Sequence, residues 1–288
     1  MDNEGALILF TLLCQLVAGS MLFYSVFYFI GKNEISRLSK GPVIKTPELL
    51  LLIGLLMAVI TSFLHPGNPG NATNALNNVG TSWLSREILS LILFSFSLLL
   101  LFFGRWLMWE RRGLVSVLFL LSAFSGIILI ISMIKLYMIP TVITWATWYT
   151  PVSFVLTTLI LGICGVMFYA LIIDWKGVIP KPVVQLLIVF LFAEAIFFIL
   201  HQNTLSKINL PHDNHFLMEN THVKYAVIRV AVILSTLILF QVFLYGRKWM
   251  MESRFPIKTL LAIALILVLF EQLIGKYMFY AGYVRLGL

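Results

Sequence analysis

The sequence predicts an all-α polytopic membrane protein with eight transmembrane helices, and two observations carry that prediction. First, 60% of the 288 residues are hydrophobic and only 11% are charged, whereas soluble domains average about 25% charged residues. A soluble fold needs a polar surface, but a surface that faces lipid does not. Second, the sequence has a series of apolar stretches of roughly 20 residues, the length that a helix needs to cross a bilayer.

Each apolar stretch is expected to be a helix, because a backbone in lipid must satisfy its own hydrogen bonds and no stretch alternates as a barrel strand does. Asp2 and Glu4 precede the first stretch, where a signal peptide would have basic residues, so we do not expect cleavage there. The protein is interpreted as a single integral membrane domain, 1–288. Its helices are expected at approximately 6–31, 48–65, 86–108, 114–138, 151–173, 182–201, 225–246 and 258–282.

The loop charges predict the orientation of the spans. Most of the 20 basic residues follow the first, third, fifth and seventh spans, where Lys and Arg mark the cytoplasmic side. Both termini are therefore expected outside the cytoplasm. The basic residues on the predicted cytoplasmic side are Lys32, Arg37, Lys40, Lys45, Arg105, Arg111, Arg112, Lys176, Lys181, Arg247, Lys248, Arg254 and Lys258.

Two of the outward connections have a distinctive composition. Residues 139–150 contain Trp145, Trp148 and Tyr149, which fit either an aromatic belt at the membrane interface or a docking surface for another protein. Residues 202–224 contain His212, His215 and His222. Their spacing is weak for a metal site, so an exposed loop that happens to contain histidines is the preferred interpretation.

The ionisable residues in or near the spans are the main functional candidates, because a charge at membrane depth is costly. His65 ends the second span and Glu87 opens the third, and a connection of about twenty residues lets the two side chains meet near one interface. An imidazole and a carboxylate there suit proton transfer with a lipid-soluble molecule. The alternative is a neutralising cluster in which Glu87 pairs with Arg86 or Lys135 and His65 ends a helix.

The remaining membrane charges favour a structural interpretation. Glu271 and Lys276 lie five residues apart in the last span, so each is expected to pair with another helix. Arg229 is the expected partner of Glu271 or Glu194. The two cysteines, Cys14 and Cys164, lie inside apolar runs, which argues against disulfides, metal sites or iron–sulfur clusters held by this protein. A dihaem core is improbable because it needs four helical histidines, whereas a single haem between His65 and His201 is left open.

Four segments also resemble a known family, the DmsC-type membrane-anchor subunit of bacterial anaerobic dimethyl sulfoxide reductases. They occur in the family order and fall along the whole length of the sequence, and the second, running from Ser62 to Ile88, is the most specific. The segments are FTLLCQLVAG at 10–19; SFLHPGNP at 62–69 with NALN at 74–77, Gly80 and SREI at 85–88; KLY at 135–137 with PTV at 140–142, Trp145 and WYTP at 148–151; and EQLIGKYMFY at 271–280.

The resemblance implies two packed four-helix bundles without haem, in the cytoplasmic (inner) membrane of a bacterium. Such anchors hold two partner subunits at the membrane. One is a ferredoxin-like iron–sulfur subunit with four clusters, and the other is a molybdopterin catalytic subunit. The anchors oxidise menaquinol and pass its electrons on, but do not themselves turn over the terminal substrate. In the family, the positions of His65 and Glu87 are tied to quinol binding and oxidation, and Gly67 belongs to the same motif. Arg86 and Lys135 are expected to support the site.

The sequence departs from the family pattern at several positions. Asn71 and Ile143 stand where the family often has arginine and proline, and Lys135 and Lys276 replace frequent arginines, keeping the charge but losing the bidentate fork. Three alternatives stay open: the equivalent anchor of a polysulfide, selenate or tetrathionate reductase, a purely structural anchor, and a secondary transporter. A transporter is disfavoured because no inverted repeat is evident. The sequence does not identify the terminal acceptor, the quinone type, the side of the catalytic subunit or the stoichiometry.

Overall fold

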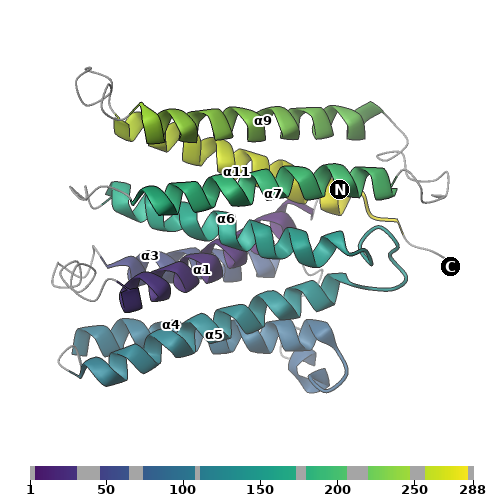
Figure 1. Ribbon diagram of the computed structural model, residues 1–288. Helices are drawn as coiled ribbons and strands as arrows, with labels where there is room; N and C mark the ends of the chain where they lie inside the picture. The colour runs from purple at the N-terminus through teal and green to yellow at the C-terminus, as the bar shows by residue number, and fades with distance from the viewer. Residues whose placement is uncertain are drawn as a thin grey trace. The chain divides into compact units, whose positions relative to one another are not determined.

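Among the residues that it describes, the computed structural model has eight helices long and apolar enough to cross a membrane, as the sequence predicts (Figure 1). It describes residues 4–30, 46–64, 74–107, 111–172, 180–205, 220–246 and 257–284. The helices are α1 (Glu4–Ile30), α3 (Pro47–Leu64), α4 (Trp83–Leu107), α5 (Arg112–Tyr137), α6 (Tyr149–Ile172), α7 (Lys181–Leu205), α9 (Asn220–Tyr245) and α11 (Ile257–Ala281), with a short 3₁₀ helix, η3 (Asn74–Asn78). The interpretation of the protein as one integral domain stays a prediction.

Local sequence explains where several helices begin. Pro47, Pro151 and Pro182 lie in the first turns of α3, α6 and α7, where the missing N–H of proline costs no helical hydrogen bond. Ser82 precedes α4 and accepts a long hydrogen bond, 3.4 Å, from the backbone N–H of Ser85, as an N-cap residue does. These are entry signals of ordinary helices, so the apolar runs need no special device to become helical.

Two expectations about polar residues near helix ends are wrong. The seventh helix begins at Asn220 rather than near 225, so His222 lies in the first turns of α9 and not in a loop. Arg105 was placed with the cytoplasmic connection after the third span, but it is a buried residue of α4. Both residues have a polar partner inside the protein, His222 with Gln202 and Arg105 with Glu48, and these partners allow a polar residue to continue an apolar helix.

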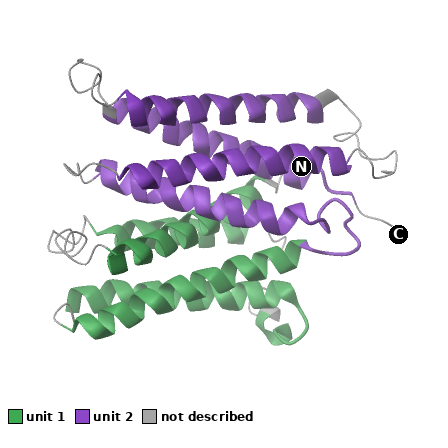
Figure 2. Cartoon of the chain, in the orientation of Figure 1, with its two compact units in different colours: residues 1–137 green, residues 138–288 purple. Residues whose placement is uncertain are grey.

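The protein divides into two compact units, residues 1–137 and 138–288, with four long helices described in each (Figure 2). In unit 1, α1 packs on α3 and α5, and α4 completes the ring by packing on α3 and α5. In unit 2, α6 packs on α7 and α11, and α9 completes the ring between α7 and α11. Each unit therefore has its own interior, as the resemblance to a pair of four-helix bundles predicts.

The interior of each unit contrasts with its outer surface. Unit 1 buries Cys14, Met21 and Phe94 completely, and unit 2 does the same with Phe154 and Leu191. Large apolar side chains such as Phe96 and Phe124 remain more than half exposed. A soluble monomer rarely exposes apolar side chains on this scale, whereas a lipid-facing surface requires them. Because most side chains in the helices are apolar, the buried polar side chains are the positions that point to a functional site.

Candidate functional site

Glu87 is a buried carboxylate near the beginning of α4. Its side chain lies one turn into the helix, and only 3% of the residue is exposed. Its Oε1 atom has no hydrogen-bond partner among the residues that the structure describes. The start of a helix favours a negative charge, but a buried carboxylate oxygen without a donor still costs several kcal/mol in general terms. Such an oxygen is available to a ligand or to a proton.

Cys14 of α1 is a fully buried side chain near Glu87. It lies within electrostatic reach of the Glu87 carboxylate. Thr11 and Gln15 are also fully buried, and with Cys14 they occupy positions i, i+3 and i+4 of one helix face. The Thr11 hydroxyl donates to the backbone carbonyl of Leu7 at 2.8 Å. Sequence reasoning gave these residues no role, although three polar or thiol side chains at helical spacing in the first span were a usable signal.

The other residues expected at the quinol site are distributed differently. Arg86 donates to the carbonyl oxygens of Val79 (2.9 Å) and Gly80 (2.6 Å) and lies over the Trp83 ring, so it fastens the turn before α4. Lys135 is exposed on α5. Among the described residues, neither cation forms an ion pair with Glu87, which leaves the neutralising-cluster alternative without support there. His65 and Gly67 lie outside the described residues.

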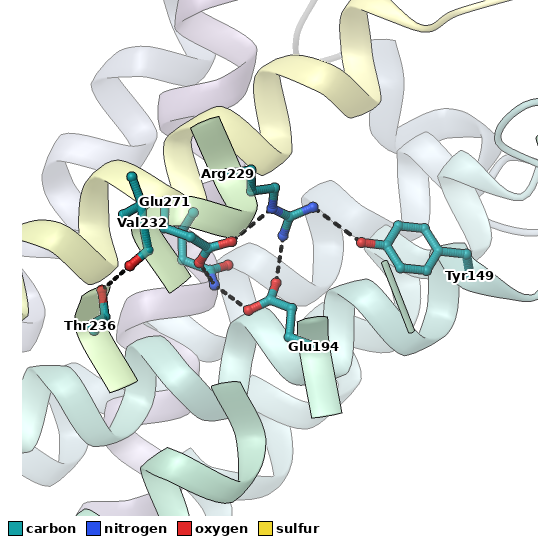
Figure 3. A network of polar contacts seen from close by, with 7 residues as sticks. Tyr149, Glu194, Arg229, Val232, Thr236 and Glu271 are labelled. Atoms are coloured by element: carbon teal, nitrogen blue, oxygen red, sulfur yellow. Dashed lines mark hydrogen bonds and ion pairs between the residues drawn. The ribbon is translucent and has the colours of Figure 1, made fainter. Parts of the chain in front are cut away.

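Unit 2 contains a second group of buried charges, centred on Arg229 of α9 (Figure 3). Its Nε donates to Glu271 Oε1 of α11 and its Nη2 donates to Glu194 Oε1 of α7, both at 2.7 Å. Its Nη1 donates to the Tyr149 hydroxyl of α6 at 3.2 Å. The guanidinium therefore ties together all four helices of the unit. We call Tyr149, Glu194, Arg229, Glu271 and Gln272 the arginine cluster.

Gln272 completes the arginine cluster from α11. Its Nε2 donates to Glu194 Oε2 at 2.7 Å and to Glu271 Oε2 at 2.6 Å, so all four carboxylate oxygens accept a hydrogen bond. Gly275 makes room for the guanidinium, because a Cβ at that position would lie 2.6 Å from Arg229 Nη2. Each charged side chain of the arginine cluster therefore has close hydrogen-bond partners, and such a network stabilises one arrangement of the helices.

Lys276 and His201 lie beside the arginine cluster. The Lys276 Nζ lies 3.5 Å from the centre of the Phe154 ring, a cation–π contact, and it has no hydrogen-bond partner in the described part of the protein. The His201 ring stacks on the Tyr149 ring with centroids 4.1 Å apart. His201, His222 and Arg229 line a small cavity of about 30 Å³.

Unit 1 also has a paired buried charge, at the opposite end of α4 from Glu87. Arg105 donates to Glu48 of α3 and to the Tyr24 hydroxyl of α1. All three residues are at most 7% exposed. Sequence reasoning missed this trio because Arg105 and Glu48 lie near span ends, where exposed charges are common.

The described residues show no arrangement suited to a metal ion. No group of three or more His, Cys, Asp or Glu side chains comes together within the ranges described above. His212 and His215 fall outside those ranges, so the expectation of a histidine loop without metal stays a prediction. What the geometry offers chemically is proton exchange, at Glu87 in unit 1 and at the cavity beside the arginine cluster in unit 2.

The sequence is similar to known proteins over most of its length. The family model described as "DMSO reductase anchor subunit (DmsC)" matches residues 1–282. The anaerobic dimethyl sulfoxide reductase protein YnfH of Escherichia coli is 34% identical over 169 residues, covering 56% of this protein and 55% of that relative. An anaerobic dimethyl sulfoxide reductase chain from Haemophilus influenzae is 32% identical over 177 residues, covering 60% of each protein. The aligned segments therefore span little more than half of these two relatives.

A longer alignment joins the protein to another relative. A second anaerobic dimethyl sulfoxide reductase chain from Escherichia coli is 28% identical over 301 aligned positions, covering 99% of this protein and 97% of that relative. No solved structure matches the sequence. The resemblance seen in the four sequence segments is thus confirmed at the level of the family and over its full length.

Proposed function

We propose that this protein, which belongs to the family of dimethyl sulfoxide reductase anchor subunits (DmsC), is the quinol-oxidising membrane subunit of a molybdenum reductase. The coarser role, that of a multi-pass membrane anchor, follows from the family and the eight apolar helices. The finer role adds menaquinol as the electron donor. It also adds two partners, an iron–sulfur subunit that receives the electrons and a molybdopterin subunit that reduces the terminal substrate. The complex would lie in the cytoplasmic membrane with both termini of this protein outside.

The observation that carries the proposal is the carboxylate of Glu87. A buried charge in a membrane helix is by default a functional hypothesis, and a structural role requires a partner that cancels the cost of burial. Glu48, Glu194 and Glu271 all have an arginine. Glu87 has no cationic partner among the described residues, and its Oε1 has no donor there. The family resemblance independently selects the same residue.

The chemistry asks little of the protein itself. Oxidation of a quinol releases two electrons and two protons and leaves a quinone. We assign one proton to Glu87, whose Oε1 accepts it from a quinol hydroxyl directly or through a water. The other is assigned to His65, on the sequence evidence alone. The electrons leave to the iron–sulfur partner, because this protein has two cysteines and neither is in a cluster motif. Burial of Glu87 would keep bulk water away from the hydroxyl that it deprotonates.

The experiment compares two electron donors in membranes that contain the assembled complex. One donor is a menaquinol analogue, and the other is a dye that reduces the catalytic partners directly. Glu87→Gln keeps the shape of the side chain but cannot take up the proton, and we expect quinol-driven turnover to fall about 10²–10⁴-fold, the usual contribution of a general base. Dye-driven turnover should be unchanged. His65→Ala is expected to behave in the same way.

Ser90→Ala is the matched control, since Ser90 lies one turn after Glu87 and its hydroxyl only donates to the Glu87 backbone carbonyl. It should leave both activities intact. Wild-type quinol-driven turnover in Glu87→Gln would refute the assignment of Glu87. Quinol-driven turnover that survives both Glu87→Gln and His65→Ala would leave the protein as an anchor without quinol chemistry.

A further inference from the structure

The cavity of unit 2 brings several polar side chains into a mostly apolar lining, and the proposed quinol chemistry does not use it. It has a volume of about 30 Å³ and is lined by side chains from α6, α7, α9 and α11 together with the 138–148 stretch. Its polar lining consists of Thr144, Tyr149, His201, Gln202, His222 and Arg229. A cavity needs roughly 10–15 Å³ of such volume to hold one water, so this one has room for water. A quinol ring is far too large for it.

Two buried polar groups at the cavity lack a partner that water would supply. His201 is 7% exposed, and its Nδ1 has no hydrogen-bond partner among the described residues. The Tyr149 hydroxyl oxygen accepts from Arg229, but its own proton finds no acceptor in the described part of the protein. Each such group costs about 1–3 kcal/mol when it is left dry. A water bound between polar groups removes that cost, which is the usual reason for ordered internal water.

A third feature connects the cavity to the end of the unit. Gln202 Oε1 and His222 Nε2 are hydrogen-bonded at 2.8 Å, and both residues are only half-buried. They lie in the last turns of α7 and the first turns of α9, which is the end of each helix that we expect to meet water if the helices cross a membrane. The polar groups thus follow one another from the half-buried Gln202–His222 pair, past His201 and Tyr149, to the buried Arg229.

We propose that this cavity is a water-filled proton-exchange site that links the arginine cluster to the aqueous phase at one end of unit 2. A hydronium ion in the cavity gives its proton to His201 Nδ1; one O–H bond breaks, one N–H bond forms and a water remains. The reverse step returns the proton, and no electron moves. The inference does not depend on quinol oxidation, since it concerns the other unit and uses none of the residues assigned to the quinol.

Several charged or titratable groups surround His201 and set the field in which it exchanges protons. They are Tyr149 on α6, Glu194 on its own helix, His222 and Arg229 on α9, and Glu271 and Lys276 on α11. The two carboxylates are held by Arg229 and Gln272, and Lys276 lies against Phe154. Of these groups, only Tyr149, His222 and Arg229 line the cavity together with His201. Because Arg229 itself lines the cavity, proton exchange with the cluster is expected to pass through the cavity water, with His201 as the buried base beside it.

The test follows hydrogen–deuterium exchange at the Arg229 guanidinium by solid-state NMR. The full-length protein, with ¹⁵N-labelled arginine, is reconstituted in lipid bilayers and transferred to D₂O, and Arg229→Lys assigns the signal. We expect exchange of Arg229 in the wild type and a severalfold loss of rate in both His201→Phe and Gln202→Leu. His201→Phe keeps a ring that can stack on Tyr149. Gln202→Leu removes the polar partner of His222 at the half-buried end of the cavity. Arg86, half-buried in unit 1, serves as the internal reference.

The matched control is Gln185→Leu, the same substitution at an exposed position of the same helix. It should exchange like the wild type. The proposal is overturned if Arg229 exchanges equally fast in His201→Phe, Gln202→Leu and wild type. It is also overturned if the wild-type signal is already as slow as in those variants, since the cavity then gives no access. Circular dichroism of each variant excludes unfolding as the source of any change.

Discussion

Glu87 in unit 1 and the two carboxylates of the arginine cluster in unit 2 are all buried in long apolar helices, but their surroundings are opposite. In unit 2, Glu194 and Glu271 share one arginine and one glutamine, and all four of their oxygens accept hydrogen bonds. In unit 1, Glu87 is buried to the same degree, yet its Oε1 has no donor within the described ranges. A satisfied buried charge holds helices together, whereas an unsatisfied carboxylate in a membrane helix is a candidate for function.

The contrast is not simply one of unit against unit, because unit 1 also has a satisfied charge. Glu48 is paired with Arg105, and Tyr24 joins them. The comparison is therefore between kinds of site. Removing a partner from a satisfied site should lower stability, and changing Glu87 should lower activity.

The largest effect on stability is expected from Arg229→Met. The substitution leaves two buried carboxylates without a cation, and breaking a buried pair in this way generally costs about 3–5 kcal/mol. The free energy of unfolding, measured in detergent by titration with a denaturing detergent, should fall by at least that amount. A variant as stable as the wild type would show that the arginine cluster does not hold unit 2 together.

Arg105→Met is expected to have the same kind of effect in unit 1, at the lower end of about 3–5 kcal/mol, since only one carboxylate is left unpaired. The same titration measures it. Arg111→Met is the control, because Arg111 is exposed just before α5. If Arg105→Met and Arg111→Met prove equally harmless, the Glu48–Arg105 pair is not structural.

Gly275→Ala should be destabilising by about 1–3 kcal/mol, the usual range for overpacking. The new Cβ would lie 2.6 Å from Arg229 Nη2 and push the guanidinium away from its two carboxylates. Gly113→Ala provides the comparison, because a Cβ there meets nothing within 4 Å. Thermal melting of the two variants side by side measures the difference, and an equal melting temperature would contradict the close fit at Gly275.

The smallest effect concerns the aromatic stretch before α6. Trp145 Nε1 donates to the Phe279 carbonyl at 2.8 Å, and its ring stacks on the Phe279 ring. Trp145→Phe keeps much of the stacking and loses the hydrogen bond, so a loss of about 0.5–1.5 kcal/mol is expected from thermal melting. Trp148→Phe, at a residue that is 42% exposed, should be closer to neutral. The reverse order would mean that Trp148, rather than Trp145, holds this stretch on α11.

The sequence was sufficient to predict the helices and the individual charged residues inside them, but not which residues those charges contact. An apolar run of about 20 residues has one stable form in lipid, so the eight helices could be predicted. Glu194, Arg229 and Glu271 each stood out by their depth. Whether these three side chains meet depends on which helices are neighbours. Helix packing decides this, between positions that are 35 and 42 residues apart in the sequence.

The buried polar residues that sequence reasoning missed were missed for two reasons. Tyr149 and Gln272 carry no charge, so their presence in a span does not signal a cost, although both complete the arginine cluster. Arg105 lies near the end of its span, where a charge usually reaches water. Glu87 could be found because it is ionised in water, lies inside a span and belongs to the most specific family segment.

The most direct test of the central claim is a paired measurement on Glu87→Gln and Glu194→Gln in the same assembled complex. Quinol-driven turnover, normalised to dye-driven turnover, and the melting temperature are measured for both. The account predicts that Glu87→Gln loses quinol-driven turnover and melts like the wild type, whereas Glu194→Gln melts lower and keeps its normalised turnover. A Glu87→Gln complex that melts lower but turns over quinol normally would contradict it, because Glu87 would then be one more structural charge.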